Sequence, residues 1–439
     1  MVALGGTMVV MFLAIATDRM HKLTAALLGS LLCTGLGLAL HVLQDYREVH
    51  RILAKDINVL GVIIGTSILV DIAGQSGLFQ FIAVKIAKRA KGDPKHLLTA
   101  LMALTLVFVS VLTIAPGTLI VVSLALVLSR TLDLQAKPYL FGIALTANSG
   151  ALSTFASGIC TLMVGSAAGI PYVQFLVVSL PMALATAVVA WLVLSRRYRN
   201  ELARPGVDDA ERRARLESFD EWAMVKDRRV FRRCAIILSL TVVGFATARL
   251  FGVGLDFIAL AGGTAALLFS GFDPEQAIKK VNWTVIVFFV GLFVMIGVVE
   301  ATGLLDVLAQ GIGAVANGNV YVALVVLVVF TAVLSGVMDN IPVAATLIPI
   351  VKSLTATLPA PPLWWGLIIG ANLGGNATPI GSVSSVIALH ALQESGGGKI
   401  GWGEFFRVGG VVLALQMVVV LLYLLTLTAL DAFPAIPTP

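Results

Sequence analysis

Charged residues are scarce in this chain: Asp, Glu, Lys and Arg make up 12% of its 439 residues, against about a quarter in a typical soluble domain. Hydrophobic residues make up 58%, and the mean hydropathy is +0.98. This composition excludes a soluble globular protein. Twelve of the 30 Lys and Arg residues, with eight of the 24 acids, lie in residues 196–233. The net charge of +6 therefore indicates a basic loop rather than a nucleic-acid-binding surface.

Cysteines and catalytic motifs are also few. Cys33, Cys160 and Cys234 lie in apolar segments without CxxC spacing. We therefore expect all three cysteines to be packing residues. The chain has no GxxxxGK[ST], HExxH or GxSxG motif, which argues against a nucleotide-driven motor, a zinc site and a hydrolase. We therefore expect no enzyme, no cofactor and no metal beyond a transported Na⁺. The first apolar run lacks a preceding basic region, which predicts a retained helix.

Apolar runs of about 20 residues, the length that spans a bilayer, recur throughout the chain. They predict an all-α polytopic membrane protein with about 10–12 transmembrane helices. The expected units are a first membrane half, 1–195, with a repeat core at 57–195, a cytoplasmic basic loop, 196–233, and a second half, 234–439, with a repeat core at 281–428. The expected spans lie near 2–17, 22–40, 57–73, 97–130, 139–168, 172–195, 234–251, 255–271, 281–299, 319–356, 363–391 and 404–428.

The two halves repeat one another at offsets of 224 to 226 residues. Asn58 aligns with Asn282 and Pro116 with Pro342, while ANSGALST, from residue 147, aligns with ANLGGNAT, from residue 371. Three matches in the same order predict an internal repeat.

Charge predicts the orientation of these repeats. Residues 84–96 carry five Lys or Arg residues, whereas the equivalent residues 299–318 carry none. By the positive-inside rule the repeats have opposite topology, an arrangement that places a solute site at their interface. We expect a multi-pass protein of the plasma (inner) membrane with both termini outside and the charged turn at 18–22 inside.

Four segments interrupt the apolar runs: 113–117, 339–342, 147–158 and 371–385. Irregular backbone at membrane depth survives only where protein buries it or where it lines a wet cavity. We therefore expect these breaks to converge on one cavity. Pro116 and Pro342 mark two of them. The candidate substrate- or ion-binding residues are Asp339, Asn340, Asn372, Gly374, Gly375, Asn376, Thr378, Ser382, Asn148, Ser149, Gly150, Ser153 and Thr154.

Asp339 carries the strongest functional signal, because it lies in an apolar run with no Lys or Arg between Lys280 and Lys352. A charge at the bilayer centre costs upward of roughly 2.5 kcal/mol, so such a residue usually handles protons or ions. A helix N-cap before Pro342 is the alternative role, and one carboxylate can serve both. The neutral amides and hydroxyls suit Na⁺ or a hydroxylated solute, although small residues also serve helix packing. Asp71 and Glu300 are expected to be interfacial caps.

The stretch SGVMDNIPVAATLIPI, with ANLGGNATPIGSVSS after it, resembles the second-half signature of the ArsB/NhaD-type superfamily of arsenite-efflux and sodium/proton antiporters. It resembles most the branch that includes the melanosomal P protein and citrate-transporter-like membrane domains. More distantly it is similar to divalent-anion/sodium symporters. The resemblance implies a secondary transporter, permits a homodimer, and permits a soluble ATPase subunit that no residue here supports.

The first repeat departs from the superfamily pattern. Residues 113–116 read Thr-Ile-Ala-Pro where a second Asp-Asn break is usual, and Ser385 replaces an expected Asn. The leading hypothesis is a proton- or sodium-coupled antiporter or efflux system for a small inorganic ion or hydroxylated solute, acting by alternating access. The alternatives are sodium-coupled uptake of a di- or tricarboxylate or a sulfate-like anion, and a membrane scaffold that has lost transport.

Overall fold

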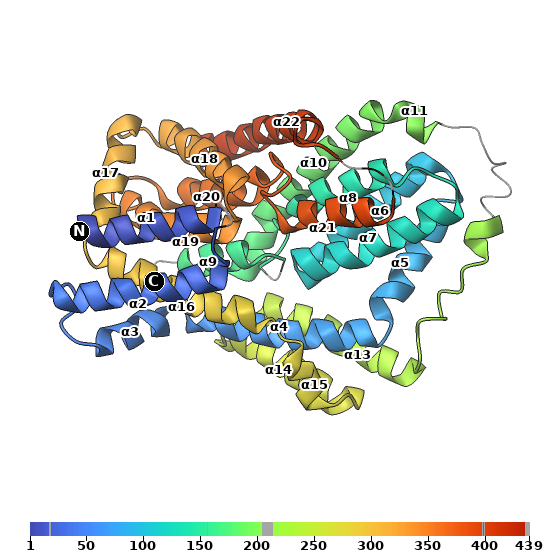
Figure 1. Ribbon diagram of the computed structural model, residues 1–439, viewed down its shortest axis with the longest axis horizontal. Coiled ribbons are helices and arrows are strands. Elements are labelled where there is room, and N and C mark those ends of the chain that lie inside the picture. The colour runs from blue at the N-terminus through green and yellow to red at the C-terminus, as the bar shows by residue number, and fades with distance from the viewer. Residues whose placement is uncertain (17–18, 156, 204–213, 397, 399, 435–439) are drawn as a thin grey trace.

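The computed structural model describes residues 1–16, 19–155, 157–203, 214–396, 398 and 400–434, so part of the predicted turn at 18–22 and part of the basic loop lie outside it. The described residues form helices and no strands (Figure 1). The first half contains α1 (Val2–Ala16), α2 (Lys22–Ala39), α3 (Arg47–Lys55), α4 (Ile57–Gln75), α5 (Leu78–Lys88), α6 (Pro94–Leu112), α7 (Ile114–Thr131), α8 (Ala136–Gly150), α9 (Ile159–Ala167), α10 (Tyr172–Arg197) and α11 (Arg199–Leu202). The second contains α13 (Arg228–Thr247), η1 (Ala248–Phe251), α14 (Leu255–Ser270), α15 (Pro274–Lys279), α16 (Trp283–Glu300), α17 (Leu304–Ala316), α18 (Val320–Val337), α19 (Asn340–Leu354), α20 (Ala360–Gly374), α21 (Val383–Glu394) and α22 (Trp402–Ala429).

The helix lengths confirm the predicted membrane architecture. Within the described ranges, nine helices are long and apolar enough to cross a bilayer, and shorter apolar helices accompany them. Large side chains on the outer faces of these helices are exposed, for example Val188 and Leu422. An apolar exterior is what a lipid solvent requires.

The two halves have the same order of elements, as the internal repeat predicts. Each contains a helical hairpin, α6 with α7 and α18 with α19, followed by a broken helix, α8 with α9 and α20 with α21. The breaks of the hairpins fall at Thr113 and Asp339, 226 residues apart. The structure thus confirms paired hairpins and broken helices in both repeats.

The opening helices of each half pack against the other half. Helix α2 lies along α16, and α14 lies along α4 (Figure 1). Both contacts are backbone-close at equivalent glycines: a Cβ on Gly65 would lie 2.3 Å from the carbonyl carbon of Ala259, and one on Gly291 would lie 2.8 Å from that of Ala26. Small residues allow this approach between membrane helices. The sequence of each repeat therefore carries the glycine that lets the opening helix of the other half pack against it.

The central polar segment is partly helical. Helix α10 continues to Arg197 and α13 begins at Arg228, inside the segment assigned to the loop from sequence, because charged residues can continue a helix beyond the apolar core. Before α13, Trp222 packs against Phe81 of α5 with ring centroids 4.5 Å apart, and Glu221 accepts a hydrogen bond from Lys88. The described end of the loop is therefore docked on the first repeat.

Candidate functional site

A cavity of about 740 Å³, here called the central cavity, lies where the breaks of the two repeats meet. The hairpin breaks contribute residues 113–116 and 339–341 to its wall, and the broken helices contribute Gly158, Ile159 and Val383. All four interrupted segments indicated by the sequence therefore face one space. The N-terminal ends of α2, α7, α9, α16, α19 and α21 also lie in this wall. Helix N-termini carry free N–H groups and partial positive charge, which favour oxyanions and other oxygen-rich solutes.

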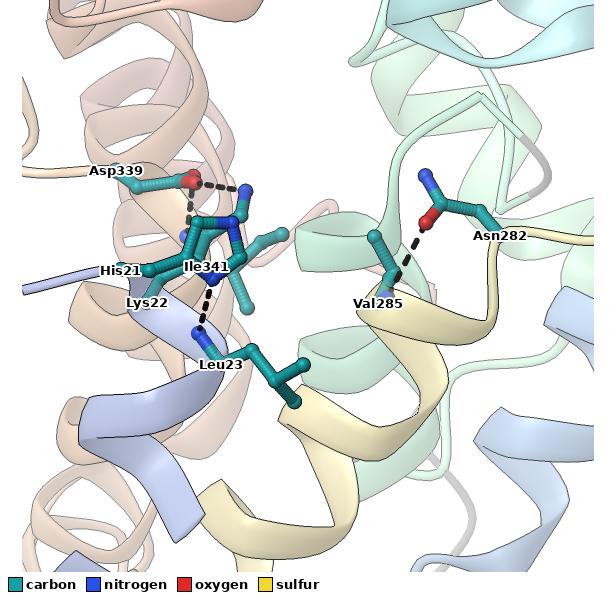
Figure 2. A network of polar contacts seen from close by, with 7 residues as sticks. All are labelled: His21, Lys22, Leu23, Asn282, Val285, Asp339 and Ile341. Atoms are coloured by element: carbon teal, nitrogen blue, oxygen red, sulfur yellow. Dashed lines mark hydrogen bonds and ion pairs between the residues drawn. The ribbon is translucent and has the colours of Figure 1, made fainter. Parts of the chain in front are cut away.

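Asp339 lies at the break between α18 and α19 and serves two structural roles. Its Oδ1 accepts a hydrogen bond from the Ile341 backbone N–H at 3.4 Å, which caps α19. Its Oδ2 lies 3.4 Å from Nζ of Lys22, the first residue of α2 (Figure 2). Pro342 fits the first turn of α19, where a missing N–H leaves no intrahelical bond unmade. The carboxylate is therefore a helix cap and an ion-pair partner in the cavity wall.

Lys22 is a partner that the sequence did not suggest, because it comes from 317 residues earlier in the chain. The side chains of Lys22 and Asp339 are 33% and 22% exposed, so the pair is reachable from the cavity. Figure 2 shows Asn282 in the same region, at the start of α16, where its Oδ1 accepts from the Val285 N–H at 3.3 Å. Three elements thus present polar groups to one space.

A second ion pair lines the same cavity. Nζ of Lys280, before α16, lies 3.5 Å from Oδ1 of Asp71, in the last turn of α4. The other carboxylate oxygen of Asp71 accepts a hydrogen bond from Gln75 Nε2 at 2.6 Å. Asp71 is therefore part of the cavity wall, whereas the sequence suggested an interfacial cap. With two lysines and two aspartates, the wall carries balanced charge.

Thr113 forms the first repeat's equivalent of the Asp339 break. Its φ of 78° and ψ of 167° fall in a region of backbone conformation that residues other than glycine rarely occupy. Helix α6 ends at Leu112 and α7 begins at Ile114, with Pro116 in the first turn. The cavity is consequently asymmetric, with a carboxylate at one hairpin break and a neutral hydroxyl at the other.

The asparagines at the tips of the broken helices form a buried network between the repeats. Asn148 Nδ2 donates to Asn376 Oδ1 at 2.8 Å, and Asn376 Nδ2 donates to Gln416 Oε1 at 2.8 Å. Ser382 Oγ donates to Asn148 Oδ1 at 2.7 Å, while Ser149 Oγ accepts from Gln416 Nε2 at 3.5 Å. These five side chains do not line the central cavity. They join the two broken helices to α22 instead.

Equivalent threonines fix each tip to its own hairpin. Thr154 Oγ1 donates to the Ser110 carbonyl at 2.7 Å, and Thr378 Oγ1 donates to the Gly336 carbonyl at 2.6 Å. Both acceptors lie three residues before the hairpin break. The repeats therefore hold their breaks in position with the same bond.

The candidate glycines are packing positions. A Cβ on Gly374 would lie 2.4 Å from the Ala332 carbonyl oxygen, and one on Gly375 would lie 2.6 Å from that of Gly381. A Cβ on Gly150 would lie 2.9 Å from the Val109 Cβ. Gly150 and Gly374 bring the broken helices close to the hairpins, and Gly375 brings the two sides of the second tip together.

Three buried oxygens in the interrupted segments have no hydrogen-bond partner among the described residues: Asn372 Oδ1, Ser153 Oγ and Ser385 Oγ. Asn372 Nδ2 is occupied, since it donates to the Ile368 carbonyl at 2.7 Å and lies 3.7 Å from Cys160 Sγ. An unpaired buried oxygen costs about 1–3 kcal/mol, which a bound donor or cation would recover. Among the candidate residues from the sequence, Asp339, Asn340 and Pro116 line the central cavity; Pro342 is buried in the first turn of α19, and the others lie in the packed tips.

The sequence did not single out Lys22, Lys280 or Gln416 as site residues. Gln416 has a recognisable signal, because it is the only polar residue in the apolar run 411–422. Lys22 and Lys280 carry none, since a lysine at the end of a span usually serves as a loop charge.

A sequence model described as a citrate transporter matches residues 12–370, which include both hairpins and the central cavity's charged residues. The chain belongs to the citrate transporter family. It is 28% identical over 420 residues to the "46 kDa membrane protein" of Mycobacterium leprae, covering 95% of this chain and 96% of that protein. An uncharacterized transporter of Synechocystis sp. is 26% identical over 442 residues, covering 95% of each chain. The P protein of Sus scrofa is 24% identical over 495 residues, which cover 94% of this chain and 58% of P protein.

The fold of this citrate transporter family chain is similar to that of the YdaH transporter of Alcanivorax borkumensis, whose topology is described as unusual. The TM-score is 0.62 at 16% identity, covering 92% of this chain and 98% of YdaH. Membership of the citrate transporter family makes the chain a multi-pass membrane transporter of small solutes, not an enzyme. This membership agrees with the resemblance of the second-half motif at the level of the family. It does not distinguish the arsenite branch from the sodium/proton branch.

Proposed function

We propose that this chain is a secondary active transporter that couples the movement of protons or Na⁺ to antiport or efflux of a small inorganic ion or hydroxylated solute. The observation that carries the proposal is the Asp339 carboxylate, 3.4 Å from Lys22 in the wall of the central cavity. The transport site comprises this pair and the helix N-termini around the cavity. The proposed setting is the plasma membrane, with the basic loop in the cytoplasm.

The ion pair supplies a coupling mechanism. A proton or Na⁺ that binds Asp339 competes with the Lys22 ammonium for the same carboxylate. Cation binding and the contact between α2 and the start of α19 are then mutually exclusive, so the cation favours a conformation in which the two helices separate. A ligand shifts a conformational equilibrium in this way only through such differential binding.

A second candidate function is sodium-coupled uptake of a di- or tricarboxylate or a sulfate-like anion. Asp339 by itself would repel an anion, but Lys22 neutralises it, and Lys280 neutralises Asp71 in the same wall. The helix N-termini at the cavity also favour an anion. Two lysines near helix N-termini match the chemistry of a carboxylate ligand.

Transport by purified protein in liposomes with an internal pH dye tests both candidates. The wild type and Asp339→Asn are challenged with Na⁺, Li⁺, arsenite and citrate under an imposed pH gradient. Asp306→Asn is the matched control, because Asp306 lies on α17 and does not line the central cavity. We expect proton movement on adding Na⁺ or Li⁺ that Asp339→Asn loses and Asp306→Asn retains.

The other responses distinguish the alternatives. A response to arsenite alone would favour the efflux branch, and Na⁺-dependent citrate entry would favour the anion symporter. Proton coupling that persists in Asp339→Asn would remove Asp339 from the proposed role. Folded protein that responds to none of these solutes would favour the scaffold hypothesis.

A further inference from the structure

A second cavity, of about 260 Å³ and here called the distal cavity, lies at the opposite ends of the helices that line the central cavity. Its wall includes Lys55 and Asp56 before α4, Ser166 in α9, Glu300 at the end of α16 and Lys352 in α19. The central cavity contacts the other end of each of these helices, for example Asp71 in α4 and Asn340 in α19. The same four helices therefore connect the two spaces.

The wall between the cavities is thin along two of these helices. On α19, Ile341 lines the central cavity and Ala345 lines the distal one. On α9, Ile159 lines the central cavity and Met163 lines the distal one. Each step is four residues, about 6 Å along a helix at 1.5 Å per residue. One helical turn of α9 and of α19 thus separates the two spaces.

The charged residues of the distal cavity are not engaged with one another. Lys55, Asp56, Glu300 and Lys352 form no ion pair within 4 Å in the described structure, in contrast to the paired lysines of the central cavity. They are close enough to interact electrostatically: burial raises the pKa of the Asp56 carboxyl, Lys352 opposes this, Glu300 adds to it, and Lys55 opposes it. Unpaired charged groups at a cavity mouth are available to a charged solute.

We propose that the distal cavity is the second mouth of the solute path, where the solute meets Lys55, Asp56, Glu300 and Lys352, and that the first turns of α9 and α19 form the barrier between the two mouths. This inference rests on the proposed transport function. It adds the binding residues on the far face and the position of the barrier.

The inferred path is tested by labelling single cysteines with a membrane-impermeant maleimide, in a chain whose three native cysteines are replaced by alanine. Ser166→Cys and Ile348→Cys report on the distal cavity, and Asn282→Cys reports on the central one. The controls are Gly318→Cys in the turn before α18, Asp220→Cys on the docked loop, and Val188→Cys on an apolar outer face. Each variant is first checked for folding by thermal unfolding, and two distal reporters guard against the loss of one.

We expect Ser166→Cys and Ile348→Cys to react from the face that labels Gly318→Cys, and Asn282→Cys from the face that labels Asp220→Cys. Val188→Cys should react from neither. Modification of Ile348→Cys should reduce transport at least tenfold, whereas modification of Asp220→Cys should leave it unchanged. Distal reporters that stay unreactive, that react from the loop face, or whose modification leaves transport intact would overturn the proposal. Because labelling requires no transported solute, a failed transport assay would count against the proposed function separately.

Discussion

Asn148 and Asn376 lie 228 residues apart in the chain, yet the side-chain amide of one donates a 2.8 Å hydrogen bond to the other in a site closed to solvent. The two residues come from different repeats, and Gln416 of α22 extends the bond into a network. The tips of both broken helices are thereby held together behind the central cavity. Polar residues in this position stabilise the interface on which the cavity is built.

Asn148→Ala and Asn376→Ala should each destabilise the protein by about 1–3 kcal/mol, because each leaves a buried partner unsatisfied. The double variant should be less destabilised than the sum, with a coupling energy of about 0.5–3 kcal/mol. Unfolding of the four proteins in detergent micelles measures the cycle. Strictly additive losses would show that the two amides do not interact.

Lys22→Asp combined with Asp339→Lys should restore the ion pair lost in either single variant, and with it part of the thermal stability, because lysine cannot accept the Ile341 N–H bond that caps α19. Transport should remain absent in the exchanged protein, because the carboxylate would then lie on α2 instead of at the break before α19. Unfolding temperature and proton-coupled transport are the two readouts. Recovery of both would show that the pair holds the fold and does not couple ions.

Gly65→Ala and Gly291→Ala should each destabilise the protein, since the added methyl would lie 2.3 Å and 2.8 Å from the backbone of the facing helix. Overpacking of this kind typically costs about 1–3 kcal/mol. Gly35→Ala is the matched control: a Cβ there meets nothing within 4 Å, and the helix gains about 1 kcal/mol from alanine. Equal unfolding temperatures for all three would contradict the close contacts of α4 with α14 and of α2 with α16.

Thr113→Gly should stabilise the protein by about 1 kcal/mol, because glycine occupies the observed φ of 78° and ψ of 167° without steric cost. Ser123→Gly, in the middle of α7, is the control and should be destabilised by about 1 kcal/mol. The measurement is unfolding in detergent. A loss of stability in Thr113→Gly would mean that the break is not strained.

Docking of the loop on α5 should weaken in acid. The hydrogen bond from Lys88 is the main cause that lowers the pKa of Glu221, so the docked state binds this proton less readily than the free loop. The stabilisation is therefore complete above the ordinary glutamate pKa of about 4.3 and is lost as the pH falls through the lowered value. A fluorophore on Ser218→Cys, in the cysteine-free chain, should report release on acidification. Glu221→Gln should release the loop at neutral pH; a Glu221→Gln loop that stays docked would show that the aromatic contact of Trp222 suffices.

Much of the fold follows from patterns in the sequence. Apolar runs predict the membrane spans. The paired Pro116 and Pro342 locate both hairpin breaks, because proline lacks the backbone N–H that a continuous helix needs. The start of α13 was less predictable. The arginines from Arg228 onward indicate a polar loop, yet they form the first turns of α13.

The site was only partly predictable. Asp339 was recognisable because an isolated carboxylate in an apolar run is costly. Its partner Lys22 was not, since contact between the start of α2 and a break 317 residues later depends on how the repeats pack. Asn148 and Asn376 carry the signal of polar residues at membrane depth, but that signal is the same for a ligand group and for a buried network.

The exchanged packing of α2 on α16 and of α14 on α4 has a consequence for the order of synthesis. When a ribosome has completed the first half, α2 is already in the bilayer but its partner is not yet made, and the backbone-close face of α4 is uncovered. Helices α2 and α4 therefore lack their packing partners until α14 and α16 of the second half have been synthesised. Docking of these opening helices is thus a late event, after translation has passed α16, whereas the contacts among α6, α7, α8 and α10 can form within the first half.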